Sequence, residues 1–356
     1  MAPPATFVDS MALQEVMISP PDANNDAAVN VNKRRVFKST GPAFVPIYVI
    51  YGGHFLGQSV YAAYKTVGKK FYCHSMTGYF LVGGKPKLPL IYTVDTIREG
   101  KNYCTRYVQV RQPSPAQQDR PLDAEVIFIA VVSFKTPEPR GLESQVPPPP
   151  ELKGWISNPK KCEIAPAVDV PSWIEHIKRK GMKEQYTAVD LRKVDVDEEN
   201  KSKPLHEHRK VQIYRPIGTF PPDEESALSI CAHVYASDRN GMFAVTGPHK
   251  VSDNILHTGS LSHTIIFHAN PSKLLFKDTN EADTDPSAWT VVEQFGESAS
   301  DGRGMIRSRL WSPDGTLLAS VMQDALIRVR IDSDENWSGK IDRRQMTFAE
   351  QLKSML

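Results

Sequence analysis

The sequence predicts an α+β protein made of two consecutive copies of one unit, each a long helix wrapped by a curled antiparallel sheet. Three observations support this: the chain length, a proline run near the middle, and the same order of predicted elements on both sides of it. At 356 residues the chain exceeds the usual size of one hydrophobic core, so two domains are expected. The run Pro147-Pro-Pro-Pro150 cannot continue a helix or join a central strand, which places a boundary there.

Four regions follow from this boundary. An N-terminal domain is expected over residues 1–140, beginning with a poorly ordered segment of roughly 30 residues. Residues 141–170 form a Pro-rich linker without hydrophobic periodicity, residues 171–330 form a C-terminal domain, and residues 331–356 form an extension.

The first half contains one predicted helix, at residues 51–67. Apolar residues recur at helical spacing from Leu56 to Val67, and the pair Gly52-Gly53 lets the backbone turn sharply into the helix. Strand-like runs follow at 71–81, 90–98, 103–111 and 124–134.

The second half repeats this order. Asp223 is the expected N-cap of a helix whose apolar stripe runs from Ala227 to Tyr235. Such an apolar helix needs a sheet to cover it. Strand-like runs follow at 261–268, 289–295, 305–311 and 316–330, and two upstream strands are expected at 185–194 and 209–216.

Composition favours a soluble intracellular protein. The formal charge of +2, from 43 basic and 41 acidic residues, gives no reason to expect a nucleic acid or an anionic membrane as partner. No apolar run approaches the ~18 residues of a membrane span, and the N-terminus lacks the pattern of a secretory signal. No CxxC spacing occurs, so the cysteines are interpreted as mostly buried thiols in a reducing compartment: Cys73, Cys104, Cys162 and Cys231.

Several dispersed segments resemble those of type II acyl-CoA thioesterases, which have two hotdog domains in one chain. In the first half these are Tyr51-Gly-Gly-His-Phe-Leu-Gly-Gln58, Cys73-His-Ser-Met-Thr-Gly-Tyr-Phe-Leu81 and Val94-Asp-Thr-Ile-Arg-Glu-Gly100. In the second half they are Tyr235-Ala-Ser-Asp238, Ser260-Leu-Ser-His-Thr-Ile-Ile-Phe-His268 and Ser320-Val-Met-Gln323. The resemblance extends over residues 30–330 and implies a tandem hotdog fold, an acyl-CoA substrate, and neither a cofactor nor a metal.

The resemblance also implies that Asp238, Ser260 and Gln323 hold the attacking water. Elementary chemistry agrees, because a carboxylate can act as general base while a hydroxyl and an amide orient the water. Gln323 interrupts an otherwise apolar face formed by the odd-numbered residues 321–329, which favours a buried role. Asp238 alone would be better explained as a residue that terminates its helix.

Three positions depart from the family pattern: His54 stands for a usual glutamine, Thr77 for a histidine and Ser262 for an aspartate. They leave the catalytic positions intact and bear on acyl preference and rate. His263 and His268 are five residues apart on one strand and hence on opposite faces, which is poor geometry for a metal site. Each is interpreted as a packed or surface histidine.

Two other functions stay open at this stage. A hotdog enoyl-CoA hydratase or dehydratase would share Asp-x-Asn with Asp238-Arg-Asn240, but Gly241-Met-Phe243 stands where a Pro-aliphatic-His sequence should follow. A non-catalytic acyl-CoA-binding role is supported only by the three departures.

Location and assembly are predicted from the end of the chain and from sheet edges. The sequence Ser354-Met355-Leu356 resembles the Ser-Lys-Leu peroxisomal targeting signal. We therefore expect a peroxisomal location and the peroxisomal import receptor as a partner, with a cytoplasmic location as the alternative. Exposed sheet edges leave a homo-oligomer open.

Overall fold

A computed structural model of the protein describes residues 5–17, 34–46, 49–138, 141–181, 188–277, 284–330 and 347. Its strands are β1 (Leu13–Glu15), β2 (Arg34–Ser39), β3 (Tyr72–Phe80), β4 (Ile91–Glu99), β5 (Tyr103–Arg111), β6 (Val126–Lys135), β7 (Glu163–Ile164), β8 (Val189–Val194), β9 (Arg209–Pro216), β10 (Ile255–Phe267), β11 (Thr290–Ser300), β12 (Arg303–Trp311) and β13 (Leu317–Val329). Its helices are α1 (Phe7–Met11), α2 (Gly52–Tyr64), α3 (Leu152–Ile156), α4 (Pro171–Lys180), α5 (Asp197–Asn200), α6 (Glu225–Ser237) and α7 (Phe243–Thr246).

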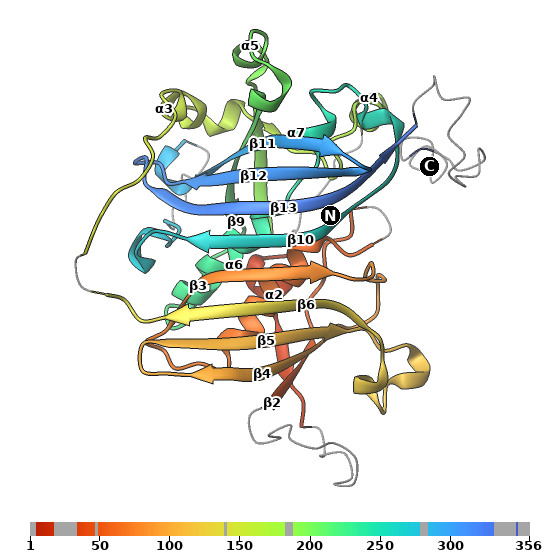
Figure 1. Ribbon diagram of the computed structural model, residues 1–356, viewed down its shortest axis with the longest axis vertical. Helices are drawn as coiled ribbons and strands as arrows, with labels where there is room; N and C mark the ends of the chain where they lie inside the picture. Colours follow the sequence, from red (N-terminus) through yellow and green to blue (C-terminus); the bar gives the residue numbers. More distant parts are fainter. Residues whose placement is uncertain are drawn as a thin grey trace.

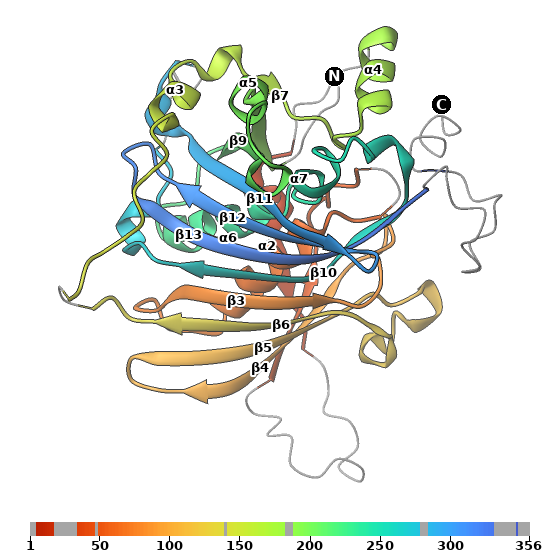
Figure 2. The same ribbon diagram turned by 45° about the horizontal axis from the view of Figure 1, so that its top comes forward.

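All thirteen described strands join one antiparallel sheet in the order β1-β2-β4-β5-β6-β3-β10-β13-β12-β11-β9-β8-β7. The two halves contribute the same meander, because β2-β4-β5-β6-β3 is mirrored by β9-β11-β12-β13-β10. They meet where β3 pairs with β10, and both ribbon views show these strands side by side in the middle of the sheet (Figures 1 and 2). At this junction Thr77 pairs with Thr264, and their hydroxyl oxygens lie 3.1 Å apart.

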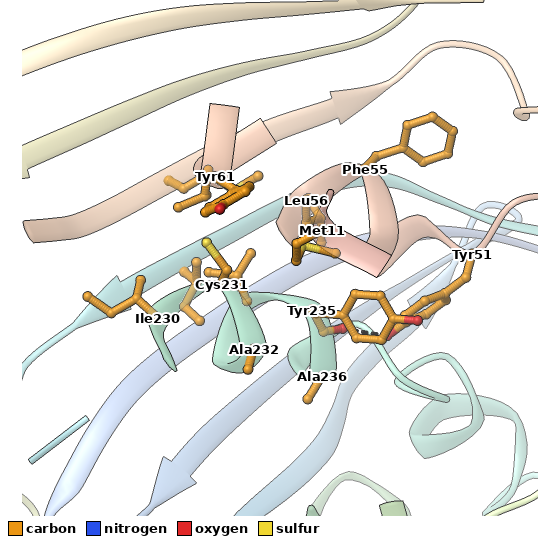
Figure 3. Packing of buried hydrophobic residues seen from close by; sticks show 14 of the residues in the cluster. Met11, Tyr51, Phe55, Leu56, Tyr61, Ile230, Cys231, Ala232, Tyr235 and Ala236 are labelled. Carbon is orange, nitrogen blue, oxygen red and sulfur yellow. Dashed lines mark hydrogen bonds between the residues drawn. The ribbon is translucent and has the colours of Figure 1, made fainter. Parts of the chain in front are cut away.

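The long helices α2 and α6 lie together on the concave side of this sheet (Figure 1). Their close approach depends on glycine: a Cβ at Gly53 would lie 2.3 Å from the carbonyl oxygen of Tyr235, and one at Gly57 would lie 3.2 Å from that of Cys231. The Tyr51 hydroxyl donates to the Tyr235 carbonyl oxygen at 2.6 Å, and the two rings meet edge to face, with centroids 4.9 Å apart (Figure 3). The helices α2 and α6 both belong to one hydrophobic core, which the two halves of the chain share.

Most predicted elements are confirmed within a few residues. The predicted helix at 51–67 is α2, and the four strands after it are β3 to β6. In the second half, β9 to β13 match their predicted ranges, although β10 begins six residues earlier, at Ile255. The extra length of β10 lacks an apolar pattern, since Thr258, Gly259 and Ser260 are polar or small.

Three local predictions were wrong. The N-terminal segment is not poorly ordered throughout: α1 has a capping box between Thr6 and Asp9, and Phe7 and Met11 are fully buried against the helix pair. The predicted linker at 141–170 contains short elements, because α3 buries Leu152 and Trp155 and β7 pairs with β8. A five-residue helix and a two-residue strand are too short to produce a periodic signal.

The other two wrong predictions concern helix starts. Asp223 does not cap α6, whose N-cap is Glu224 without a side-chain cap bond. Gly52 and Gly53 do not form a turn but are the first two residues of α2, where close packing excludes a side chain.

The described cysteines contain no disulfide, and three of the four are buried, as expected. None of the helices in the described part of the chain combines the length and apolar character that a membrane crossing needs. The tripeptide Ser354-Met355-Leu356 lies outside the described residues.

Candidate active site

The structure brings the three predicted site residues together. Asp238 is the C-cap of α6 and only 7 % exposed. Ser260 lies on β10 at a register irregularity, and Gln323 lies on β13, the strand paired with β10. The sequence places them 22 and 63 residues apart, so only the pairing of β10 with β13 over the end of α6 makes them neighbours.

The three side chains form a closed set of hydrogen bonds. The Gln323 amide donates to Asp238 Oδ1 and to Ser260 Oγ, both at 2.7 Å. The Ser260 hydroxyl donates to the same Asp238 Oδ1 at 3.1 Å. Both Gln323 N–H bonds and the serine hydrogen are thereby directed within the trio, and Asp238 Oδ1 accepts from both Gln323 and Ser260.

The pKa of the Asp238 carboxyl is raised toward neutral pH. Burial raises its pKa from 3.8 to about 7, although hydrogen bonds from Ser260, the Gly53 backbone N–H and Gln323 act in the opposite direction. Arg239 also favours the charged form. Desolvation therefore outweighs the donors, which gives the carboxyl a proton affinity suited to general-base catalysis near neutral pH.

The first half of the chain contributes backbone to this site. Gly52 lies so close to the carboxylate that a Cβ there would be 2.6 Å from Asp238 Oδ2. On the opposite side, a Cβ at Gly241 would be 2.7 Å from Gln323 Oε1. The glycines at both positions thus leave room for the trio, and the positive end of α2 faces the carboxylate.

A cavity of about 790 Å³ adjoins the trio. Asp238 and Ser260 form part of its wall, whereas Gln323 lies behind them. Its apolar lining comes from both halves: Ile50, Phe55, Phe80, Leu81 and Val82 from the first, and Met242, Phe243, Leu256, Leu261 and Leu326 from the second. Such a volume lies within the range of small-molecule sites, which are typically roughly 300–1,000 Å³.

Two models of known protein families match this chain. The family model for the acyl-CoA thioesterase C-terminal domain matches residues 105–327, and the model for the N-terminal domain matches residues 42–135.

The chain belongs to the acyl-CoA thioesterase family.

Relatives of this thioesterase agree. The human acyl-coenzyme A thioesterase 8 is 27% identical over 307 residues, covering 82% of this chain and 85% of the relative. The Saccharomyces cerevisiae peroxisomal acyl-coenzyme A thioester hydrolase 1 is 23% identical over 264 residues, covering 62% and 72%. The solved acyl-CoA thioesterase II of Mycobacterium marinum has a TM-score of 0.59 at 22% identity, covering 91% and 98%. The predicted tandem hotdog fold is thereby confirmed, and the protein is a thioester hydrolase.

One further residue lies beside the trio. His263 of the thioesterase is fully buried, with Nε2 2.9 Å from Ser237 Oγ and Nδ1 3.9 Å from Asp238 Oδ1. Strand alternation carried the signal, because His263 shares its face with buried Ile265 and Phe267 while His268 is exposed.

The three departures from the family pattern lie outside the trio. His54 is fully buried in α2, where burial lowers its pKa to about 4. Thr77 lies at the β3–β10 junction and Ser262 on β10, opposite Tyr79. None of the three makes a hydrogen bond with Asp238, Ser260 or Gln323.

Proposed function

We propose that this thioesterase hydrolyses fatty acyl-CoA to free fatty acid and CoA, with a water molecule activated by Asp238, Ser260 and Gln323. The observation that carries the proposal is the convergence of the Ser260 hydroxyl and the Gln323 amide on one oxygen of a buried carboxylate, beside a largely apolar cavity. An acyl chain needs such a cavity, and thioester hydrolysis needs a base at its wall.

The network indicates how water enters the trio. Ser260 donates to Asp238 over 3.1 Å, the longest of the three bonds, so a water inserted there replaces the weakest contact. It would then donate one proton to Asp238 Oδ1 while Ser260 orients its lone pairs. Holding the nucleophile in this way lowers the barrier by proximity as well as by base catalysis.

The proton and electron balance of hydrolysis fits one carboxyl group. As the water oxygen bonds to the thioester carbon, Asp238 takes the proton and the carbonyl oxygen gains charge. The carbon–sulfur bond then breaks, and Asp238 returns the proton to the departing thiolate. A pKa of about 7 allows both transfers near neutral pH.

Backbone N–H groups are the expected stabilisers of the oxyanion. Both N–H bonds of the Gln323 amide are directed to Asp238 and Ser260. The start of α2 presents N–H groups beside the carboxylate, and its N-cap residue Tyr51 makes no side-chain cap bond. Donors fixed in the fold need no reorganisation when charge develops.

The two alternative functions have less support. Hydration of enoyl-CoA would need a base histidine after Asn240, and the chain has Met242 and Phe243 there, both on the cavity wall. A purely binding role gains nothing from a buried carboxyl with a raised pKa, which costs folding stability.

The test replaces the proposed base. We expect Asp238→Ala to lower kcat by roughly 10² or more while the protein stays folded. CoA release is followed with a thiol-reactive dye over short, medium and long acyl chains. Asp324→Ala is the matched control, because Asp324 follows Gln323 but pairs with Arg303 on the outer face. Wild-type activity in Asp238→Ala would refute the assignment.

We also propose a peroxisomal location. The name of the yeast relative and the tripeptide Ser354-Met355-Leu356 support it. A fluorescent fusion should accumulate in peroxisomes and lose that location when the tripeptide is removed. A fusion that stays in the cytoplasm in both forms would contradict this proposal without touching the chemistry.

A further inference from the structure

We propose that His263 is a positioning residue of the hydrolytic site, which anchors the end of α6 through Ser237 and accepts a hydrogen bond from Asp238 when that carboxyl carries the proton taken from water. The inference rests on the proposed role of Asp238 as general base. It adds a group that never touches substrate and acts only through Asp238.

The position of His263 links all parts of the site. It lies on β10 directly opposite Gln323 on β13, and its ring is fully buried beneath the end of α6. One ring nitrogen meets Ser237, the residue before Asp238, and the other faces Asp238 Oδ1 at 3.9 Å. From its place on β10, the His263 imidazole therefore contacts both the end of α6 and the Asp238 carboxylate.

The hydrogen bonds of Ser237 determine which nitrogen carries the proton. The Ser237 hydroxyl donates to the Val234 carbonyl oxygen at 2.8 Å, so its hydrogen is already used. The 2.9 Å contact must then run from His263 Nε2–H to Ser237 Oγ. Because burial lowers the pKa of His263 to about 3, the ring is neutral and Nδ1 presents a lone pair.

This lone pair distinguishes the two protonation states of Asp238. Nδ1 has no hydrogen-bond partner among the described residues, and its nearest acidic neighbour is Asp238 Oδ1. An ionised carboxylate is repelled by a lone pair, whereas a carboxylic acid can donate to it after a small rotation. The contact therefore strengthens only after water has given up its proton, which is the property required of a catalytic interaction.

No additional reactant is needed for this step. Asp238 receives the proton when the water O–H bond breaks, shares it with Nδ1, and returns it to the thiolate when the carbon–sulfur bond breaks. His263 keeps its own Nε2 proton throughout. The other ionisable groups that face Asp238 are Arg239, the next residue in the chain, and Tyr51 at the start of α2.

Two substitutions separate the anchor from the acceptor. His263→Gln keeps a donor near the Nε2 position and removes the Nδ1 lone pair, whereas Ser237→Ala removes only the anchor. We expect His263→Gln to lower kcat about tenfold, the effect of one lost hydrogen bond to an acid. The acid limb of its kcat/KM profile should move to lower pH by about half a unit or more, since the acid form of Asp238 loses an acceptor.

The controls make the outcomes distinct. Ser237→Ala should lower kcat without moving the acid limb, and His263→Asn, which keeps an acceptor near Nδ1, should leave the limb where it is in the wild type. An unmoved limb in folded His263→Gln would overturn the inference. Retained activity in Asp238→Ala would instead refute the base assignment, so the two failures are distinguishable.

Discussion

At the scale of the residue, the proposed chemistry depends on where the Asp238 carboxyl is placed. Three hydrogen-bond donors favour its charged form, yet its pKa still rises to about 7 because the group is removed from water. Ser260 and Gln323 alone would have produced a weak base. Burial under the end of α6 gives the carboxylate its proton affinity and lowers the stability of the folded protein.

Because burial of the ionised Asp238 carboxyl destabilises the folded protein, we predict that Asp238→Asn stabilises the protein at high pH. The folded pKa of about 7 lies above the unfolded value of 3.8, so stability is lost as pH rises between these values. An asparagine cannot ionise and escapes the loss. We expect the melting temperature of the variant to exceed that of the wild type by about 2 °C or more at pH 8. The gap should nearly close at pH 4.5.

Scanning calorimetry at both pH values measures this gap. Asp324→Asn, on the outer face of the same strand as Gln323, should show no such pH-dependent gain. A constant difference between Asp238→Asn and the wild type at both pH values would show that ionisation of Asp238 is not the cause.

At the scale of the element, the site exists because two helices approach unusually closely. Gly53 contacts the Tyr235 carbonyl and donates its N–H to Asp238, so one residue serves both packing and electrostatics. The Tyr51 hydroxyl donates a hydrogen bond to the same Tyr235 carbonyl oxygen. Any side chain at position 53 would separate α2 from α6 and move the carboxylate away from its backbone donor.

We therefore predict that alanine at two helical glycine positions has opposite effects on the stability of the protein. Gly53→Ala would place a methyl group 2.3 Å from a backbone oxygen, and we expect it to destabilise the protein by about 1–3 kcal/mol. Gly154→Ala, in α3 with nothing within 4 Å of a new Cβ, should be neutral or stabilising by about 0.5–1 kcal/mol. Urea unfolding of both variants checks the two signs; equal effects would contradict the packing argument.

Periodicity predicted the elements better than their contacts. Apolar spacing located α2, α6 and the two meanders, because those segments bury a continuous face. The same method missed α1, whose anchors Phe7 and Met11 come from a five-residue helix. It also took the two glycines for a turn, since a sequence shows that a side chain is absent but not what occupies its place.

The candidate site was found for a different reason. Gln323 stands out on an apolar face, but nothing in the spacing joins it to Asp238 or Ser260; the family resemblance supplied that link. His263 is packed, as the sequence allowed, but the sequence does not reveal which element covers the inner face of β10. Proximity to α6 is a tertiary property, so it could not be read from one strand.

At the scale of the whole molecule, the two halves have diverged around the same framework. Lys65 follows α2 as Asp238 follows α6, and Cys73 precedes Thr77 by the same number of residues as Ser260 precedes Thr264. Position 132 on β6, a valine, corresponds to Gln323 on β13. Where the second half has the buried Asp238 carboxyl, the first half has Lys65, which forms an ion pair with Glu224 of the second half.

The first half forms part of the wall of the cavity beside the trio. It supplies the aromatic lining Phe55 and Phe80 and the backbone of Gly52, while the polar wall comes from the second half. Because the polar wall lies on the second-half side, we expect the acyl chain to extend toward the first half. We then expect the phosphates of CoA to face the second-half rim, where the exposed Arg328 lies on the cavity wall.

This orientation predicts a substrate-dependent effect of Arg328→Glu. Reversing a charge at the rim should raise KM for acyl-CoA about tenfold at low salt, because the phosphates lose an attractive partner and meet a repulsive one. The N-acetylcysteamine thioester of the same acid has no phosphate, so its kcat/KM should be unchanged. Arg303→Glu changes the same charge outside the cavity, where Arg303 pairs with Asp324, and should affect neither substrate. Equal losses for both thioesters in Arg328→Glu would place the phosphates elsewhere, while a loss confined to acyl-CoA that fades as salt is added would fix the direction in which the substrate lies.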